Sequence, residues 1–231
     1  MKIHHIPNTR SVRIIWLCEE LGLPYEVESY AFGDPRMREA GYLARHPMAR
    51  VPVLEDGETV VFESGAIVQY LLAKYGEGRL VPDPASPEFP HYLTWLHYAE
   101  GMMMPQVNTI VVETRMLPED KRNPVNLERA VKLLTRMLTG VERQLEGRDY
   151  LAGAFSGADI MTGHASVVAS KLGADLSDKP NTAAYVERLL ARPASRRRRR
   201  RSGPARCSTA AAFRGRGRYT ARAGASIGGC I

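Results

Sequence analysis

The stretch that decides the fold is RVPVLEDGETVVFES, residues 50–64. Two short apolar runs flank an Asp-Gly pair at residues 56–57, and this pattern predicts a β-hairpin. Pro52 has no N–H to donate, so it belongs at a sheet edge or in a cis turn. The residue before a proline is held extended, which leaves the backbone of Val51 available to a group outside the sheet.

A helix is expected to begin directly after the hairpin, at Ser64, and to end at Gly76. The Ser64 hydroxyl is expected to cap this helix, whose N-terminus favours a carboxylate. Glu63 offers a negative charge to an ammonium group. A free backbone edge, a carboxylate site and an ammonium site in one short stretch predict a pocket for a short zwitterionic peptide.

The residues before this stretch predict a strand at 2–6, a helix with an apolar face ending at Gly22, and a second strand at 24–27. Together with the hairpin and the following helix, this order resembles the glutathione transferase superfamily. The segments SVRIIWLCEELGLPYE, residues 11–26, and ESGAIVQYL, residues 63–71, are similar to its first and third helices.

The resemblance, to bacterial and fungal members with a serine- or threonine-type site, covers residues 1 to about 193. It implies a thioredoxin-like α/β domain over residues 1–78, a linker over 79–90 and an all-α helical domain over 91–193. Amphipathic helices are predicted at 91–115, where Pro105 should introduce a kink, at 126–146 and at 182–191.

The resemblance also implies glutathione as co-substrate. Val51, ahead of a cis Pro52, would pair its backbone with the cysteinyl unit, and Glu63 and Ser64 would take the γ-glutamyl head group. Arg50 would bind the glycyl carboxylate or simply face water. Alternatively, Glu63 is only a solvated charge and Ser64 only a helix cap.

The catalytic group is expected at the start of the first helix. A free thiol has a pKa of about 8.5, so a donor that stabilises the sulfur anion increases the thiolate fraction. Thr9 falls where serine-type transferases place their catalytic serine, and Ser11 is the alternative. Both could instead be plain helix caps. Arg10 stands near the place of the nucleophile in cysteine-type members, which argues against thiol exchange.

A pocket for a small hydrophobic electrophile is expected against the first long helix, at Tyr98, Met102 and Met103. Methionine adapts its shape to varied apolar ligands, and it is also ordinary core filler. The predicted activity is glutathione transfer to small electrophiles or reduction of peroxides, by a homodimer. A non-catalytic glutathione-binding or interaction protein on the same scaffold is the alternative.

The composition predicts a cytoplasmic protein. No apolar run reaches the roughly 18 residues that span a membrane, and the N-terminus does not have the pattern of a signal peptide. The three cysteines have neither disulfide nor metal-site spacing, so we expect a reducing compartment and no bound metal.

The C-terminal end departs from the family pattern. Of the 32 lysines and arginines, eleven arginines lie from Arg196 onward with no acidic residue, so the first 195 residues hold 21 basic against 25 acidic side chains. We interpret residues 194–231 as a disordered basic tail arising from a reading-frame error, which would impair solubility or activity. The alternative is RNA binding through this tail, which contains RGRGRY at residues 214–219. The rest of the chain gives no electrostatic reason to bind nucleic acid.

Overall fold

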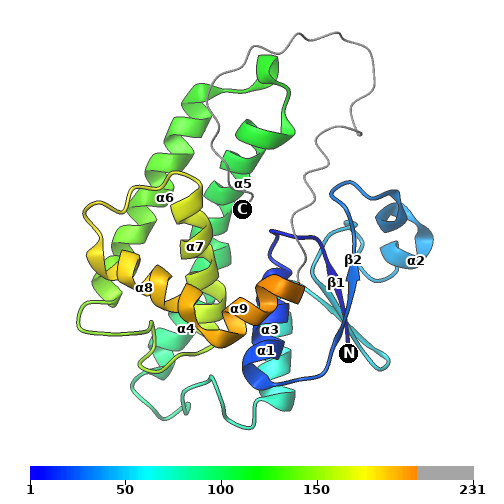
Figure 1. Ribbon diagram of the computed structural model, residues 1–231, viewed down its shortest axis with the longest axis horizontal. Coiled ribbons are helices and arrows are strands. Elements are labelled where there is room, and N and C mark those ends of the chain that lie inside the picture. The colour runs from blue at the N-terminus through cyan, green and yellow to red at the C-terminus, as the bar shows by residue number, and fades with distance from the viewer. Residues whose placement is uncertain (202–231) are drawn as a thin grey trace.

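The computed structural model describes residues 1–201 (Figure 1). One mixed sheet has the strand order β2-β1-β3-β4, in which β1 and β2 run parallel and β3 is antiparallel to both of its neighbours. Its strands are β1 (Lys2–His5), β2 (Glu26–Ser29), β3 (Val53–Asp56) and β4 (Thr59–Phe62). The predicted hairpin is confirmed, with Asp56 opposite Thr59 across the Asp-Gly turn. The first strand of the hairpin begins only at Val53, because Pro52 cannot donate to the ladder.

The α-helices are α1 (Val12–Leu21), α2 (Ala40–Leu43), α3 (Ser64–Tyr75), α4 (Phe89–Tyr98), α5 (Met104–Val111), α6 (Pro124–Gln144), α7 (His164–Lys171), α8 (Pro180–Ala191) and α9 (Pro193–Arg201). Short 3-10 turns form η1 (Pro35–Arg38) and η4 (Glu119–Lys121). Wider π-helical segments form η2 (Ala99–Met103), η3 (Val112–Met116) and η5 (Asp159–Gly163). The thioredoxin-like sheet with a helical second half is therefore the predicted fold class.

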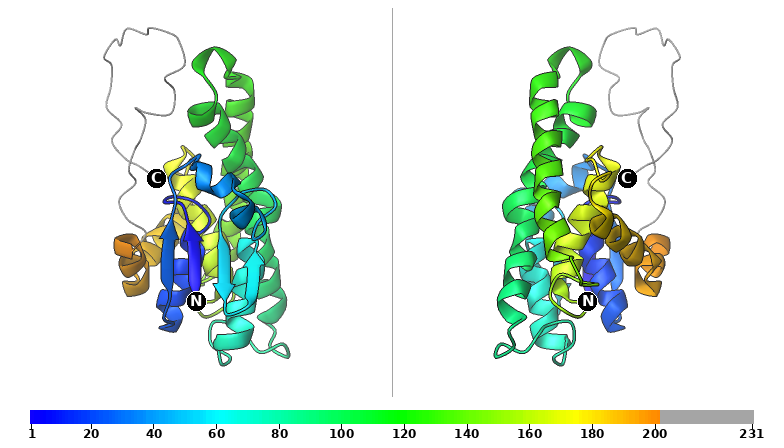
Figure 2. Two further views of the ribbon diagram at one scale, coloured as in Figure 1. Left: turned by 90° about the vertical axis from the view of Figure 1, so that its right-hand side faces the viewer. Right: turned by 90° about the vertical axis from the view of Figure 1, so that its left-hand side faces the viewer.

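Alternation along the strands gives the sheet two covered faces, because successive side chains point to opposite sides. Ile3 and Leu54 are fully buried in the main core, which α1 and α3 share with the helical half. Val53 joins a smaller core under η1 and α2 with Ile6, Tyr30, Met37 and Tyr42. In the left panel of Figure 2 the strands lie in front and the helical half lies behind them.

The predicted helix over 91–115 is present as the succession α4, η2, α5 and η3. Pro105 lies in the first turn of α5, directly after the π-helical turn, where its missing N–H costs no α-helical hydrogen bond. The next helix, α6, begins at Pro124 because the side chain of Asn123 caps it by accepting the N–H groups of Val125 and Asn126.

A buried capping motif fixes the loop before η5. The carboxylate of Asp159 accepts the N–H groups of Leu151, at 3.1 Å, and Ser156, at 2.8 Å, and the hydroxyl of Tyr185, at 2.7 Å. Burial raises the pKa of Asp159, and these hydrogen bonds oppose the shift. The motif therefore ties the loop to α8.

The prediction of disorder from residue 194 is wrong for residues 194–201, which lie in α9. This helix lies along α1 (Figures 1 and 2) because the end of α1 supplies acidic partners: Arg192 contacts Glu20 at 2.7 Å and Arg197 contacts Glu19 at 2.6 Å. The rest of the predicted tail, residues 202–231, lies outside the described residues.

Candidate active site

The loop between β1 and α1 holds both predicted catalytic hydroxyls in one hydrogen-bond network. Ser11 is fully buried, and its Oγ lies 2.7 Å from Nδ1 of His5 and 2.7 Å from Oγ1 of Thr9. The Thr9 hydroxyl donates to the carbonyl of Ile6 at 2.8 Å, and the Ser11 hydroxyl lies 3.2 Å from the same oxygen. Thr9 is only half-buried, so of the two it is the hydroxyl nearer to solvent.

The Ser11 hydroxyl does not cap α1, whereas Oγ1 of Thr9 accepts the N–H of Ser11 at 3.4 Å. Ser11 occupies the N-cap position with helical backbone angles and makes no side-chain capping bond. The plain capping reading is therefore wrong for Ser11. Its hydroxyl is instead committed to His5, Thr9 and the backbone of Ile6. Ser11 has no exposed surface, so of the two hydroxyls only that of Thr9 is near solvent.

The Val51-Pro52 peptide bond is cis, and a side chain of α2 holds the residue before Val51. Tyr42, on α2, donates its hydroxyl to the carbonyl of Arg50 at 2.7 Å. Within residues 1–201, no protein group hydrogen-bonds to the backbone N–H or carbonyl of Val51. The side chain of Arg50 is exposed to water.

Glu63 and Ser64 lie side by side at the start of α3 with opposite surroundings. Glu63 is exposed and has a positive φ of 72°, which is uncommon for a residue with a side chain. Ser64 is buried, and its hydroxyl accepts a hydrogen bond from Nη1 of Arg13 at 3.0 Å. The prediction that the Ser64 hydroxyl caps α3 is thus wrong, because the cap position is Glu63 and the hydroxyl is bonded to α1.

Arg13 is the centre of a buried charged cluster that joins the two halves of the chain. Its guanidinium has no exposed surface, pairs with Glu100 of η2 and donates from Nε to Nδ1 of His164 at 3.2 Å. Arg10 shares the same carboxylate, with Nε 3.2 Å from Oε2 of Glu100. Nη2 of Arg13 has no hydrogen-bond partner among the described residues.

The cluster carries a surplus positive charge. Burial, and then the neighbouring Arg13, lower the pKa of His164 well below its usual range, so this imidazole is neutral and its Nδ1 can accept the hydrogen bond that Arg13 donates. Burial also lowers the pKa of Arg13, and Glu100 opposes that shift. Two guanidinium groups therefore share one carboxylate beside Ser64, which favours an anion there.

Two of the residues predicted for the apolar pocket on the first long helix are engaged inside the protein. Tyr98 donates its hydroxyl to the carbonyl of Met137 on α6 at 3.0 Å, and Met103 is fully buried in the main core. Both side chains therefore make contacts within the helical half, and the second-substrate pocket stays a prediction. Met102 is 44% exposed. Beside Thr9, the chain presents Arg10, which donates to the side chain of Asn108 on α5 at 3.1 Å.

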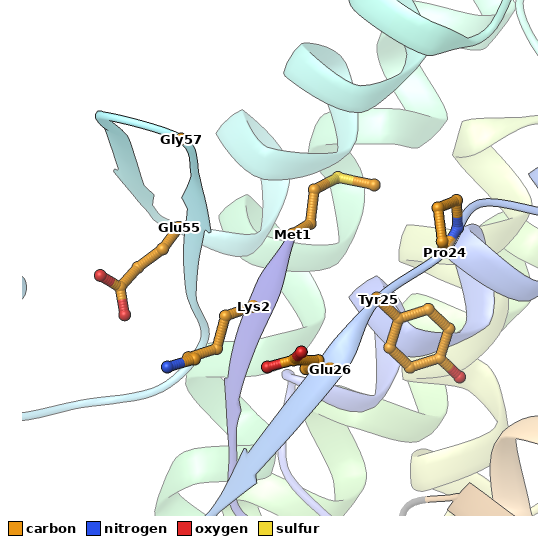
Figure 3. A pocket seen from close by; sticks show the side chains of 7 residues that line it. All are labelled: Met1, Lys2, Pro24, Tyr25, Glu26, Glu55 and Gly57. Carbon is orange, nitrogen blue, oxygen red and sulfur yellow. The ribbon is translucent and has the colours of Figure 1, made fainter.

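Two surface hollows lie away from these residues. The larger, of about 510 Å³, lies at the end of the sheet between β1, β2 and the hairpin (Figure 3) and is lined by Met1, Lys2, Pro24, Tyr25, Glu26, Glu55 and Gly57. The smaller, of about 420 Å³, lies between the end of α1 and α9. Neither is lined by a residue predicted for the site.

Residues 1–201 contain neither a cluster of metal-binding side chains nor a membrane-spanning helix. No group of three or more His, Cys, Asp or Glu side chains in this part of the chain is arranged to hold a metal ion. Of the helices described, none is both long enough and apolar enough to cross a membrane.

Sequence reasoning missed Arg13, Glu100, His164, Tyr42 and His5. A signal for Arg13 was present, because it lies between Val12 and Ile14 in the apolar run of the first helix. No local pattern could have identified its partners, because Glu100 and His164 are 87 and 151 residues away along the chain.

The chain combines a thioredoxin-like sheet, a cis Val51-Pro52 bond directly before β3 and a helical second half. Residues 1–73 match the family described as "Glutathione S-transferase, N-terminal domain". Glutathione S-transferase 4 of Zea mays is 33% identical over 193 residues, covering 79% of this chain and 84% of the maize protein. Glutathione S-transferase 3 of Schizosaccharomyces pombe is 30% identical over 168 residues, covering 68% and 69%. The chain belongs to the glutathione S-transferase family.

Solved structures agree with this membership. A glutathione transferase from Phanerochaete chrysosporium in complex with oxidized glutathione has a TM-score of 0.78 at 27% identity, covering 87% of this chain and 95% of that one. A glutathione transferase from Burkholderia graminis, with two glutathione molecules bound per subunit, has a TM-score of 0.76 at 26% identity, covering 85% and 86%.

Proposed function

We propose that the protein is a glutathione transferase that activates the thiol of glutathione through the hydroxyl of Thr9. The observation that carries this proposal is the network at the start of α1, in which Thr9 is half-buried and Ser11 is fully buried behind it. The thiolate then attacks a small electrophile or reduces a peroxide. Family membership and relatives that bind glutathione support the choice of co-substrate.

Glutathione is proposed to lie along the Val51 segment. The N–H and carbonyl of Val51 pair with its cysteinyl unit, since no described protein group occupies them. The exposed carboxylate of Glu63 receives the ammonium group of the γ-glutamyl head. Ser64 and the surplus positive charge at Arg13 receive its carboxylate. Arg50, exposed and next to Val51, is available to the glycyl carboxylate.

Thr9 has a single proton, which in the described structure is donated to the carbonyl of Ile6. The Ser11 hydroxyl lies 3.2 Å from that carbonyl and is held by His5, so it can take over as donor. Thr9 is then free to turn its proton toward the sulfur anion. A hydrogen bond to an anion stabilises it, and each pKa unit corresponds to about 1.4 kcal/mol.

The second substrate is proposed to enter beside Thr9, where Met102 supplies an exposed apolar side chain. The neighbouring Arg10 and Asn108 make this surface polar on the α5 side. We also propose that the protein works in the cytoplasm as a homodimer, which is typical of the family. Light scattering of the purified chain measures the dimer directly.

Ultraviolet titration of bound glutathione tests the catalytic proposal against its rival, a non-catalytic glutathione-binding protein. Thiolate absorbance should appear at a lower pH in the complex than for free glutathione. Retention on immobilised glutathione with an unchanged thiol pKa would instead support the non-catalytic protein. Failure of the chain to be retained at all would contradict both readings.

A further inference from the structure

Arg10 reaches from the loop before α1 to two separate segments of the helical half. Its Nε lies 3.2 Å from Oε2 of Glu100 on η2, and its Nη2 donates to Oδ1 of Asn108 on α5 at 3.1 Å. The side chain of Arg10 is 25% exposed, whereas that of Arg13 has no exposed surface. Of these two cations, Arg10 is therefore the one that a molecule outside the protein can touch.

The outer edge of the Arg10 guanidinium has N–H groups to spare. Within residues 1–201, Glu100 is the single acidic partner of Arg10, and the other oxygen of that carboxylate pairs with Arg13. Nη1 of Arg10 makes no hydrogen bond with any residue in this range. Because a guanidinium has five N–H donors and no acceptor, Arg10 remains open to an acceptor supplied by a ligand.

Asn108 adds further donors at the same edge. Its side chain is exposed, and its Oδ1 accepts the hydrogen bond from Arg10. The Nδ2 group belongs to the same planar amide, so its two N–H donors lie close to the guanidinium. No residue in the described part of the chain accepts a hydrogen bond from Nδ2. Arg10 and Asn108 thus offer neighbouring donors without a matching acceptor.

These donors lie next to the proposed reacting sulfur. Arg10 directly follows Thr9, the proposed donor to the sulfur of glutathione, and neighbouring Cα atoms are about 3.8 Å apart. Met102, which is 44% exposed, lies two residues after Glu100 on η2. A second substrate that enters beside Thr9 therefore meets elements that present both an apolar side chain and N–H donors.

We propose that Arg10 and Asn108 bind a carboxylate on the second substrate, so that the enzyme prefers anionic electrophiles to neutral ones. Bound glutathione must supply the thiolate, so this assignment rests on the function proposed above. A guanidinium fork matches the two oxygens of a carboxylate, and a primary amide can donate to the same oxygens. The apolar body of the electrophile would lie against Met102, which adapts to varied shapes.

A suitable probe is 4-chloro-3,5-dinitrobenzoate. The thiol proton of glutathione passes to water, the sulfur anion forms a C–S bond to carbon 4, and chloride leaves with the electron pair of the broken C–Cl bond. The carboxylate takes no part in this reaction. The methyl ester of the same molecule has the same leaving group and no charge, so the difference in KM between the two probes reports recognition of the carboxylate.

Steady-state assays with both probes test the assignment. The KM of the parent chain for the carboxylate should be roughly tenfold below that for the ester. Arg10→Gln should remove most of this difference by raising the KM for the carboxylate, while the KM for glutathione and the thiol pKa of bound glutathione stay unchanged. A raised KM for glutathione with an unchanged preference for the carboxylate would place Arg10 in the glutathione site and overturn the proposal.

Asn108→Asp provides a second test at an exposed position. It keeps an acceptor for Arg10 and adds a negative charge, so the KM for the carboxylate should rise roughly tenfold and that for the ester should stay within about twofold. Gln106→Glu is the matched control, because it makes the same charge change on α5 about 200° around the helix from Asn108. It should leave both KM values within about twofold, and equal effects of the two variants would contradict the carboxylate site.

Direct binding separates this site from the proposed activity. Calorimetry compares the product conjugate, S-(4-carboxy-2,6-dinitrophenyl)glutathione, with the conjugate whose aryl carboxylate is methylated. If the parent chain turns over neither electrophile but prefers the charged conjugate, and Arg10→Gln removes that preference, the carboxylate site is supported and the transferase activity is contradicted. Turnover of both electrophiles with equal KM, together with equal affinity for the two conjugates, would support the transferase and overturn the carboxylate site.

Discussion

The side-chain oxygens of Thr9 and Ser11 lie 2.7 Å apart, with Nδ1 of His5 2.7 Å beyond Ser11. Only Thr9 in this row is near solvent, so under the proposed mechanism Ser11 and His5 would act on a substrate through Thr9. The sequence alone could not decide between these two hydroxyls. Their burial makes Thr9 the proposed hydrogen-bond donor to the sulfur and Ser11 the residue that holds Thr9 in place.

Thr9→Ala should lower kcat/KM for glutathione transfer by roughly 10- to 100-fold, because the sulfur anion loses its proposed donor. The pKa of bound glutathione should rise toward that of the free thiol. Thr9→Ser keeps a hydroxyl and should retain most activity. Steady-state assays with a chromogenic electrophile measure kcat/KM for both variants. A Thr9→Ala variant with the full rate would exclude Thr9 as the donor.

Ser11→Ala should reduce turnover less than Thr9→Ala and should also destabilise the fold. The buried His5 ring loses a hydrogen-bond partner and the N–H of Ile6 loses its acceptor, which costs about 1–3 kcal/mol. Ser166→Ala is the matched control, since Ser166 is equally buried and bonds the carbonyl of Thr162 at 2.9 Å. Both variants should melt earlier, but only Ser11→Ala should raise the thiol pKa.

Tyr42→Phe should raise the KM for glutathione several-fold with little change in kcat. The variant removes the donor that holds the Arg50 carbonyl next to Val51, and costs about 1 kcal/mol of stability. Tyr98→Phe removes a similar hydroxyl bond to the Met137 carbonyl, far from the Val51 segment, and should change neither constant. Equal KM values in the two variants would show that Tyr42 does not position the binding segment.

Glu100→Gln should lower the free energy of unfolding by about 2–4 kcal/mol, because it leaves the fully buried Arg13 without its carboxylate. Urea denaturation measures the change. The control is Glu88→Gln, which breaks a partly exposed pair with Arg148 and should cost less than about 1 kcal/mol. Equal costs would mean that the burial of Arg13 is not the reason for the effect.

Asp56 should make stability depend on pH in the acid range. Hydrogen bonds from Lys74, Tyr75 and Tyr70 lower the pKa of its carboxyl to about 2. A carboxyl with a lowered folded-state pKa stabilises the fold above its unfolded pKa, and that contribution is lost as the pH falls through the folded value. Asp56→Asn should therefore cost about 1 kcal/mol near neutrality, because water around the exposed Lys74 screens the ion pair, and the difference from the parent chain should vanish between pH 4 and pH 2.

Local patterns were sufficient to predict much of the fold. The Asp-Gly turn fixed the hairpin, and apolar periodicity located α1, α3, α6 and α8 to within about two residues. Residues 50–64 also predicted that Val51 lies just before the hairpin and Glu63 just before α3. These features depend on residues that are close together in the sequence.

The errors come from contacts between distant segments. The π-helical turn η2 changes the phase of the first long helix, so helical spacing did not separate the exposed Met102 from the buried Met103. Composition predicted disorder after residue 194, whereas Glu19 and Glu20, more than 170 residues earlier, dock α9. Ser64 looked like a cap because its bond to Arg13 spans 51 residues.

The position of Arg13 limits how this protein can be taken apart. Its single guanidinium has partners on α3, on η2 and on α7, so cutting the chain in the linker would leave each piece with an incomplete set. A recombinant hybrid with the helical half of another transferase would keep the Arg13 guanidinium but lose the Glu100 carboxylate that pairs with it. The two halves therefore depend on each other through this one side chain, and a chimera would need Glu100 and His164 transplanted along with the junction.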